Sequence, residues 1–248
     1  MRGTMVEVKT HDGVADAYLS RPDDREGRPA VLFLIDIHGL RPHIERMVDR
    51  IAERGYVVLA PNLFYRAGRA PLSQIPADLT DPAQRDPYME QVLSLARALT
   101  PERIVSDGVA YIDLLERLGR GPVAIAGYCM GARMGWLIAA ADPTRVAALA
   151  GFHVGGMVTD GEDSPHHRAG TIAAEVYFGH ADNDANMTAE QIAAVERALD
   201  EAGVRHRTEV YEGAPHGYTM ADTPGYDEAA SERHYAELFA LLERTIGA

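Results

Sequence analysis

The chain of 248 residues is poor in cysteine and in positive charge, and it has no long apolar run. Its one cysteine, Cys129, excludes an internal disulfide and leaves no CxxC pair for a metal or redox site. No stretch approaches the roughly 20 apolar residues of a membrane span. The opening residues MRGTMVEVKT lack the apolar core of a secretory signal. Because a lone thiol is a liability in an oxidising compartment, we expect a cytoplasmic protein.

Lys and Arg total 24 against 37 Asp and Glu, which gives a formal net charge of −13. This acidic excess disfavours nucleic acid and anionic membranes as partners. The hydrophobic fraction of 46% is ordinary for a globular chain. The length suits one α/β domain, so we predict a single domain over residues 1–248. The composition leaves the oligomeric state open between a monomer and a homodimer.

Short apolar runs alternate with segments of helical spacing along the chain. The expected strands are 6–8, 15–19, 30–35, 56–60, 123–126, 146–150, 173–178 and 206–211, and the expected helices are 44–54, 89–99, 104–118, 131–141, 189–202 and 226–246. This alternation predicts an α/β fold with a mostly parallel central sheet and helices on both faces. A polar loop is expected at 21–29, and a longer one at 61–87 is either a lid or a wall. Ligands bind at the carboxyl ends of the strands in such folds, so the functional side chains should follow the apolar runs.

The sequence Gly127-Tyr128-Cys129-Met130-Gly131 follows the run VAIA and precedes a predicted helix. It matches the nucleophile elbow G-x-S-x-G of α/β-hydrolases with cysteine in the serine position. The elbow is a sharp strained turn, and flanking side chains would collide with the neighbouring strand and helix. The helix N-terminus also favours a thiolate, the reactive form of cysteine. The pattern therefore predicts Cys129 as a nucleophile rather than a buried packing residue.

The nucleophile needs a base and an acid, which elbow enzymes place in the chain order nucleophile, acid, histidine. Asp182 and His216 both come shortly after predicted strands and in that order. We expect His216 to accept the thiol proton and Asp182 to orient the imidazole. Asp184 competes for the acid role, and Asp182 is preferred because it comes directly after Gly-x-x in the segment that begins at Gly179.

The other histidines have simpler interpretations. His180 lies too near Asp182 along the chain to be its partner and is interpreted as structural. His166 and His167, with Asp163, could suggest a metal site, but adjacent histidines in a polar loop are more often solvated. We therefore predict no metal ligands and no cofactor.

The segment Asp36-Ile37-His38-Gly39 follows the strand expected at 30–35. In an elbow hydrolase, this loop and the residue after the nucleophile supply the two N–H groups of the oxyanion hole. We expect these donors to be the backbone N–H groups of Ile37 and Met130. Each such donor is typically worth about 3–4 kcal/mol of transition-state stabilisation.

These segments resemble the dienelactone hydrolase family over essentially the whole chain. The resemblance rests on D-I-H-G, G-Y-C-M-G, G-H-A-D and A-P-H-G-Y, and on the run P-G-Y-D before the last helix. It implies hydrolysis of a small ester or lactone through a thiol ester on Cys129, without a metal or organic cofactor. It also implies a triad of Cys129, Asp182 and His216.

The resemblance also points to substrate-binding positions and to two departures. Asp36 stands where the best-known members carry a glutamate that contacts the cysteine. Met220 stands where they carry an arginine that binds the substrate carboxylate. Arg85 is the candidate for a second substrate arginine. The safer expectation is therefore hydrolysis of an ester, lactone or thioester rather than of the dienelactone itself.

Two other functions remain open at this level. One is a non-catalytic hydrolase-like protein that binds or senses a small ligand, although such a protein has no need of nucleophile, base, acid and oxyanion loop together. The other is a redox sensor that uses Cys129 as a low-pKa thiol, without a second cysteine to resolve it.

Overall fold

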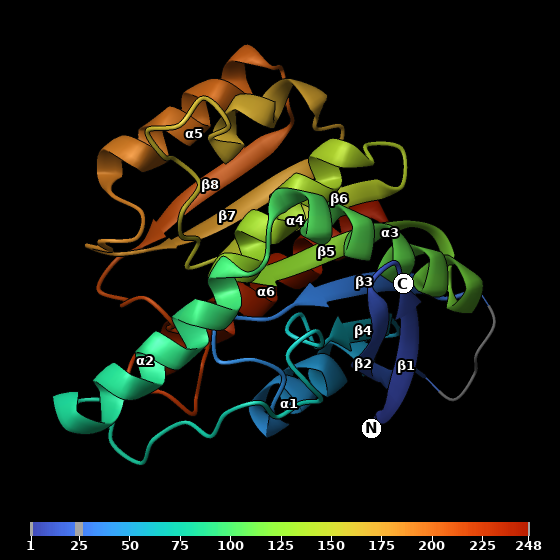
Figure 1. Cartoon of the computed structure of the whole chain (residues 1–248). Helices are drawn as coiled ribbons and strands as arrows, with labels where there is room; N and C mark the ends of the chain where they lie inside the picture. The colour runs from blue at the N-terminus through green and yellow to red at the C-terminus, as the bar shows by residue number, and fades with distance from the viewer. Residues whose placement is uncertain (1, 23–26, 248) are drawn as a thin grey trace.

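The computed structural model describes residues 2–22 and 27–247, so residues 23–26 of the predicted polar loop lie outside the described residues. Its described part is built on an eight-stranded sheet in the order β1-β2-β4-β3-β5-β6-β7-β8 (Figure 1). The strands are β1 Thr4–Thr10, β2 Gly13–Ser20, β3 Pro29–Leu34, β4 Val57–Pro61, β5 Arg120–Tyr128, β6 Val146–Phe152, β7 Glu175–Ala181 and β8 His206–Tyr211. β2 pairs antiparallel with β1 and β4, and the other pairings are parallel.

Helices cover both faces of this sheet. They are α1 Pro42–Ala52, α2 Pro82–Arg97, α3 Pro101–Leu118, α4 Met130–Ala141, α5 Ala189–Glu201 and α6 Glu228–Thr245, with a short 3-10 helix η1 at Pro165–Thr171. In Figure 1, α4 lies in front of the sheet and α6 behind it. The predicted α/β class, with a mostly parallel sheet covered on both faces, is confirmed.

The central strands read as continuous apolar runs because both of their faces are covered. Every residue of β3 and β4 is buried. Helix α3 packs on α4 so closely that a Cβ at Gly108 would lie 2.6 Å from Cγ1 of Ile138. On the other face, Arg50 of α1 donates two hydrogen bonds to Glu232 of α6 and stacks over Tyr235. These contacts fix the helices on both faces of the sheet. The sheet in turn supports the loops at the carboxyl ends of its strands.

Helix α2 begins at Pro82, earlier than the predicted start at 89. Asp81 caps it by accepting a hydrogen bond from the Ala83 N–H, and proline is well suited to the first helical position. Pro87 lies inside the helix, which is why sequence patterning placed this residue in a loop.

The first part of the predicted loop at 61–87 packs as a wall. The Asn62 side chain donates to Asp16, and Tyr65 and Arg66 both donate to Asp107. These buried and half-buried contacts fix the segment against β2 and α3.

Candidate active site

Cys129 stands in the turn between β5 and α4, as the elbow pattern predicted. Its φ is 53°, a left-handed conformation that is strained for a residue with a side chain. A Cβ at Gly127 would lie 2.6 Å from the Ala132 backbone, and one at Gly131 would lie 2.2 Å from the Leu34 carbonyl oxygen. Both glycines are therefore required by close packing of the turn against α4 and β3.

The His216 imidazole bridges the cysteine and a carboxylate. Its Nε2 lies 3.1 Å from Cys129 Sγ, and its Nδ1 lies 2.5 Å from Asp184 Oδ2. Burial alone would lower the pKa of His216, but the hydrogen bonds to Asp184 and Cys129 outweigh it and raise the pKa to about 10. The imidazole is thus held in its charged form at neutral pH beside the Asp184 carboxylate.

Asp184, and not Asp182, contacts His216, so the expected Asp182–His216 pair is wrong. β7 runs to Ala181, which leaves Asp182 at the very end of the strand, where its Oδ2 accepts the Gly213 N–H at 2.9 Å. Asn183 follows with a φ of 51° and redirects the chain, so that the next carboxylate reaches the imidazole.

The Asp184 carboxylate is itself well supported. Asn186 donates to it from both its backbone N–H and its side-chain amide. Burial would raise the pKa of Asp184, but the hydrogen bonds from His216 and Asn186 hold it below the ordinary value. The carboxylate is therefore ionised at neutral pH and can orient the ring.

The two residues expected to supply the oxyanion donors line the same cleft as the cysteine. Ile37 and Met130 line a cleft together with Cys129. Met130 is the first residue of α4, so its N–H has no acceptor within the helix. Among the described residues, the Ile37 N–H donates no hydrogen bond. Both N–H groups are therefore available to a ligand oxygen.

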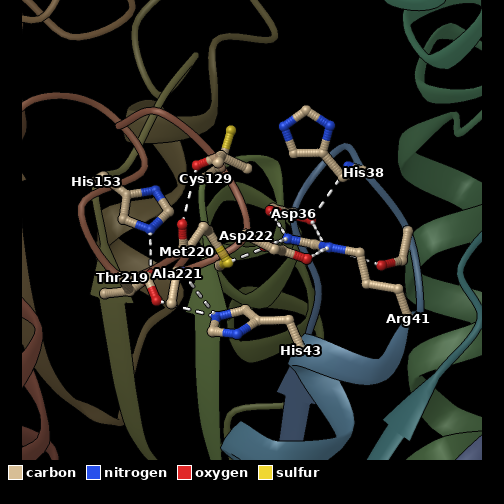
Figure 2. Close-up of polar contacts among 12 residues, drawn as sticks. Asp36, His38, Arg41, His43, Cys129, His153, Thr219, Met220, Ala221 and Asp222 are labelled. Carbon is tan, nitrogen blue, oxygen red and sulfur yellow. Dashed lines mark hydrogen bonds and ion pairs between the residues drawn. The ribbon is translucent and has the colours of Figure 1, made fainter. Parts of the chain in front are cut away.

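The Asp36 carboxylate is hydrogen-bonded to Arg41 and not to the cysteine, which differs from what its place in the sequence suggested. Its carboxylate is buried and accepts two hydrogen bonds from Arg41, at 2.7 and 3.0 Å (Figure 2). It also accepts the His38 N–H at 3.1 Å. Asp36 therefore fixes the loop that carries the Ile37 N–H.

Arg41 is a residue of the site that sequence reasoning missed. Its guanidinium is 6% exposed and is bound by two carboxylates, because Asp222 accepts from Nε and Nη2. Burial would lower the pKa of Arg41, but Asp36 and Asp222 raise it further above its ordinary value. Since the pairing with Asp222 joins residues far apart in the chain, no local sequence signal could reveal it.

Arg85, the other expected substrate ligand, does not reach the site. It lies near the start of α2 and pairs with its exposed neighbour Asp86 at 2.7 Å. The far end of α2 borders the cleft instead, through Leu93 and Arg97. The expected contact of Arg85 with substrate is therefore not supported by its position.

Two cavities meet at Cys129. The larger is a cleft of about 500 Å³ that Arg133 also lines, and the smaller, of about 80 Å³, is bordered by His153 and His216. Arg133 and His153 were not singled out in the sequence. Arg133 comes one helical turn after the nucleophile, a spacing that could have identified it.

The remaining histidines do not form a metal site. His166 hydrogen-bonds the Ser164 side chain at 2.9 Å. Within residues 2–22 and 27–247, no group of three or more His, Cys, Asp and Glu side chains is placed to hold a metal ion. In the same part of the chain, no helix has the length and apolar content needed to cross a bilayer.

Comparison with known proteins identifies the family of the chain. The model of the dienelactone hydrolase family matches residues 15–246. The chain belongs to this family. It is 29% identical over 224 residues to a Salmonella typhi protein named "Putative carboxymethylenebutenolidase", covering 87% of this chain and 77% of that one. It is 26% identical over 242 residues to "Carboxymethylenebutenolidase 1" of Cupriavidus pinatubonensis, covering 96% and 95%.

The fold is also that of solved family structures. A Klebsiella pneumoniae structure described as "Putative Dienelactone Hydrolase" superposes with a TM-score of 0.83 at 21% identity, covering 98% of each chain. This member of the dienelactone hydrolase family is therefore an ester or lactone hydrolase with the α/β-hydrolase fold.

Proposed function

We propose that the protein hydrolyses small esters or lactones through a thiol ester on Cys129. The observation that carries this proposal is the row Cys129–His216–Asp184, with 3.1 Å from sulfur to Nε2 and 2.5 Å from Nδ1 to the carboxylate. This arrangement pairs a nucleophile with a base and the base with an orienting group.

In the first half-reaction the thiolate sulfur attacks the carbonyl carbon of the substrate. The carbonyl oxygen takes up negative charge and accepts hydrogen bonds from the Ile37 and Met130 N–H groups. The C–O bond then breaks, and His216 gives its proton to the departing alkoxide. For a lactone, the freed hydroxyl stays on the acyl group.

In the second half-reaction water attacks the thiol ester. Neutral His216 accepts one water proton while the hydroxyl adds to the carbonyl carbon. The tetrahedral intermediate then collapses: the C–S bond breaks, the Cys129 thiolate leaves, and the acyl group is released as the carboxylic acid. The proton left on His216 restores the imidazolium beside the thiolate.

We also propose that the substrate carries an acidic group held by Arg133. The Nε of Arg133 is buried and has no hydrogen-bond partner among the described residues, and Arg133 lines the cleft at Cys129. An unsatisfied buried donor is costly, and a carboxylate satisfies a guanidinium with two parallel hydrogen bonds. Arg41 is unsuited to this task because its donors are occupied.

The test is trapping of the acyl-enzyme. The wild-type protein is mixed with 4-nitrophenyl acetate, quenched in acid and analysed by mass spectrometry of its peptides. We expect the acetyl group on Cys129 and no label in Cys129→Ala or His216→Ala. Full turnover by both variants, or a label on another residue, would overturn the assignment of the nucleophile.

A further inference from the structure

His153 combines three unusual features directly beside His216. It follows β6 with a φ of 38°, and the other non-glycine residues of positive φ in the described chain are Cys129 and Asn183 of the same site. Its side chain is fully buried. Its Nδ1 has no hydrogen-bond partner among the described residues. Backbone strain and an unsatisfied buried polar atom each cost folding free energy. Residues that combine such costs are found mainly at functional sites.

The rest of the His153 imidazole is firmly held. Its Nε2 lies 2.8 Å from Thr219 Oγ1 (Figure 2), and its backbone N–H donates to the Gly179 carbonyl at 2.8 Å. The ring packs edge-on to His216, with 5.2 Å between ring centroids, and edge-on to Tyr218 at 5.1 Å. The orientation of the ring, and with it the direction of Nδ1, is therefore fixed.

The unpaired nitrogen belongs to a residue that lines the smaller cavity. This cavity measures about 80 Å³ and is bordered by Cys129, His153 and His216. A water molecule takes about 30 Å³ in the liquid and needs two to four polar partners, so the cavity suits water rather than an acyl chain. The acyl chain has its own space in the cleft of about 500 Å³.

Given the thiol-ester mechanism proposed above, we propose that His153 Nδ1 positions the water that hydrolyses the acyl-enzyme. The water donates one hydrogen to His216 Nε2, which accepts that proton, and its other hydrogen to His153 Nδ1. Its oxygen attacks the thiol-ester carbon, the C–S bond breaks, and the thiolate leaves. His153 itself neither gains nor loses a proton.

The charge state of His153 fits this role. Burial, together with the nearby His216 and His234, lowers the pKa of His153 well below its ordinary value. The ring is therefore neutral, and in the tautomer that donates Nε2–H to Thr219 the Nδ1 lone pair is free to accept. A protonated ring could not accept the water hydrogen.

The proposal predicts that loss of Nδ1 slows hydrolysis of the acyl-enzyme but not its formation. In stopped-flow measurements with 4-nitrophenyl acetate, we expect His153→Phe to keep the rate and amplitude of the 4-nitrophenol burst. We expect its steady-state turnover to fall by about 10²-fold, the size of effect that misplacing a reacting group causes. Mass spectrometry should then show acetylated Cys129 accumulating in the variant.

Two further variants separate positioning from packing. Asn tolerates positive φ and places a side-chain oxygen near the position of Nδ1, so His153→Asn should restore most of the turnover. Should the phenylalanine variant not fold, His153→Gly accommodates the backbone, and added imidazole should rescue its turnover. His234→Phe removes another buried imidazole, one that borders neither cavity at Cys129, and should leave the ratio of burst to turnover unchanged.

Equal turnover in wild type, His153→Phe and His153→Gly would overturn the role of His153. A burst that slows together with turnover would also overturn it, because acylation does not use this water. Failure of the thiol-ester mechanism itself has a different signature: the wild-type enzyme would show no burst and no acetylated Cys129.

Discussion

The Arg41 guanidinium lies against the Met220 thioether, with 3.5 Å between Nη2 and Sδ. Met220 occupies the position where the best-known family members carry a substrate-binding arginine. In this chain the guanidinium that contacts this position comes from Arg41, the residue preceding α1. Asp36 and Asp222 hold the guanidinium there. It therefore braces the loop that carries the Ile37 N–H and is not free to bind a substrate.

Replacing Arg41 should therefore destabilise the protein. Arg41→Met leaves the buried Asp36 carboxylate and the half-buried Asp222 carboxylate without their cation, and breaking a buried pair costs about 3–5 kcal/mol. Urea denaturation would measure the free energy of unfolding. Arg46→Met changes an exposed arginine one turn further along α1 and should cost within about 0.5 kcal/mol. Equal losses in both variants would contradict the bracing role.

The two aspartates after β7 offer a matched test of the triad. Asp184→Asn removes the charge that orients His216, and we expect kcat/KM for an aryl ester to fall by about 10⁴-fold, as in serine triads. Asp182→Asn keeps an oxygen that can accept the Gly213 N–H and should leave kcat/KM almost unchanged. The reverse order of effects would restore Asp182 as the acid.

The elbow was predictable because its requirements are local. Gly127 and Gly131 are needed by the turn itself, and the adjacent apolar run and helix identify it in the sequence. The position of His216 after β8 follows from strand order in the same way. The acid was missed because Asp182 was preferred for its place after Gly-x-x, in a segment expected to lie beyond a strand ending at 178, whereas the observed strand continues to Ala181. Strand ends are uncertain by a few residues, and a shift of two changes which carboxylate meets the imidazole.

The arginines show where local reasoning fails. Arg85 lies in a segment whose sequence has no fixed spacing from the elbow, and the structure pairs it with Asp86. The role of Arg41 depends on Asp222, a contact that no sequence pattern encodes. His153 and Arg133 line the two cavities at Cys129 only because β6 and α4 pack against loops from elsewhere in the chain, which the local sequence does not reveal.

The raised pKa of His216 makes a prediction for thiol reactivity. With a pKa of about 10, the imidazole stays charged from pH 6 to pH 8, so a positive charge lies beside Cys129 Sγ, 3.1 Å from Nε2, throughout this range. Alkylation by iodoacetamide should therefore stay fast as the pH falls. In His216→Gln the charge is absent, so the rate should fall about tenfold per pH unit below about 8.5, the ordinary thiol pKa. The same steep fall in wild-type protein would exclude the ion pair.

The Arg133 side chain makes a prediction for substrate choice. The enzyme should prefer 4-nitrophenyl hemiadipate, which ends in a carboxylate, to the similarly sized neutral 4-nitrophenyl hexanoate. Arg133→Met should lower kcat/KM for the hemiadipate by about 10- to 100-fold, the value of one or two charge-assisted hydrogen bonds. The hexanoate should be hydrolysed as before, since it does not use the guanidinium.

A cation elsewhere on the surface gives the control for this substrate preference. Arg85→Met removes the same charge from α2 but leaves the cleft intact, and it should change neither rate. Raising the salt concentration separates contact from long-range attraction, because a direct pair in the cleft is screened less than exposed charges such as Arg97. If Arg133→Met slows both esters equally, Arg133 supports the elbow or the fold, and the acidic group of the substrate is bound elsewhere.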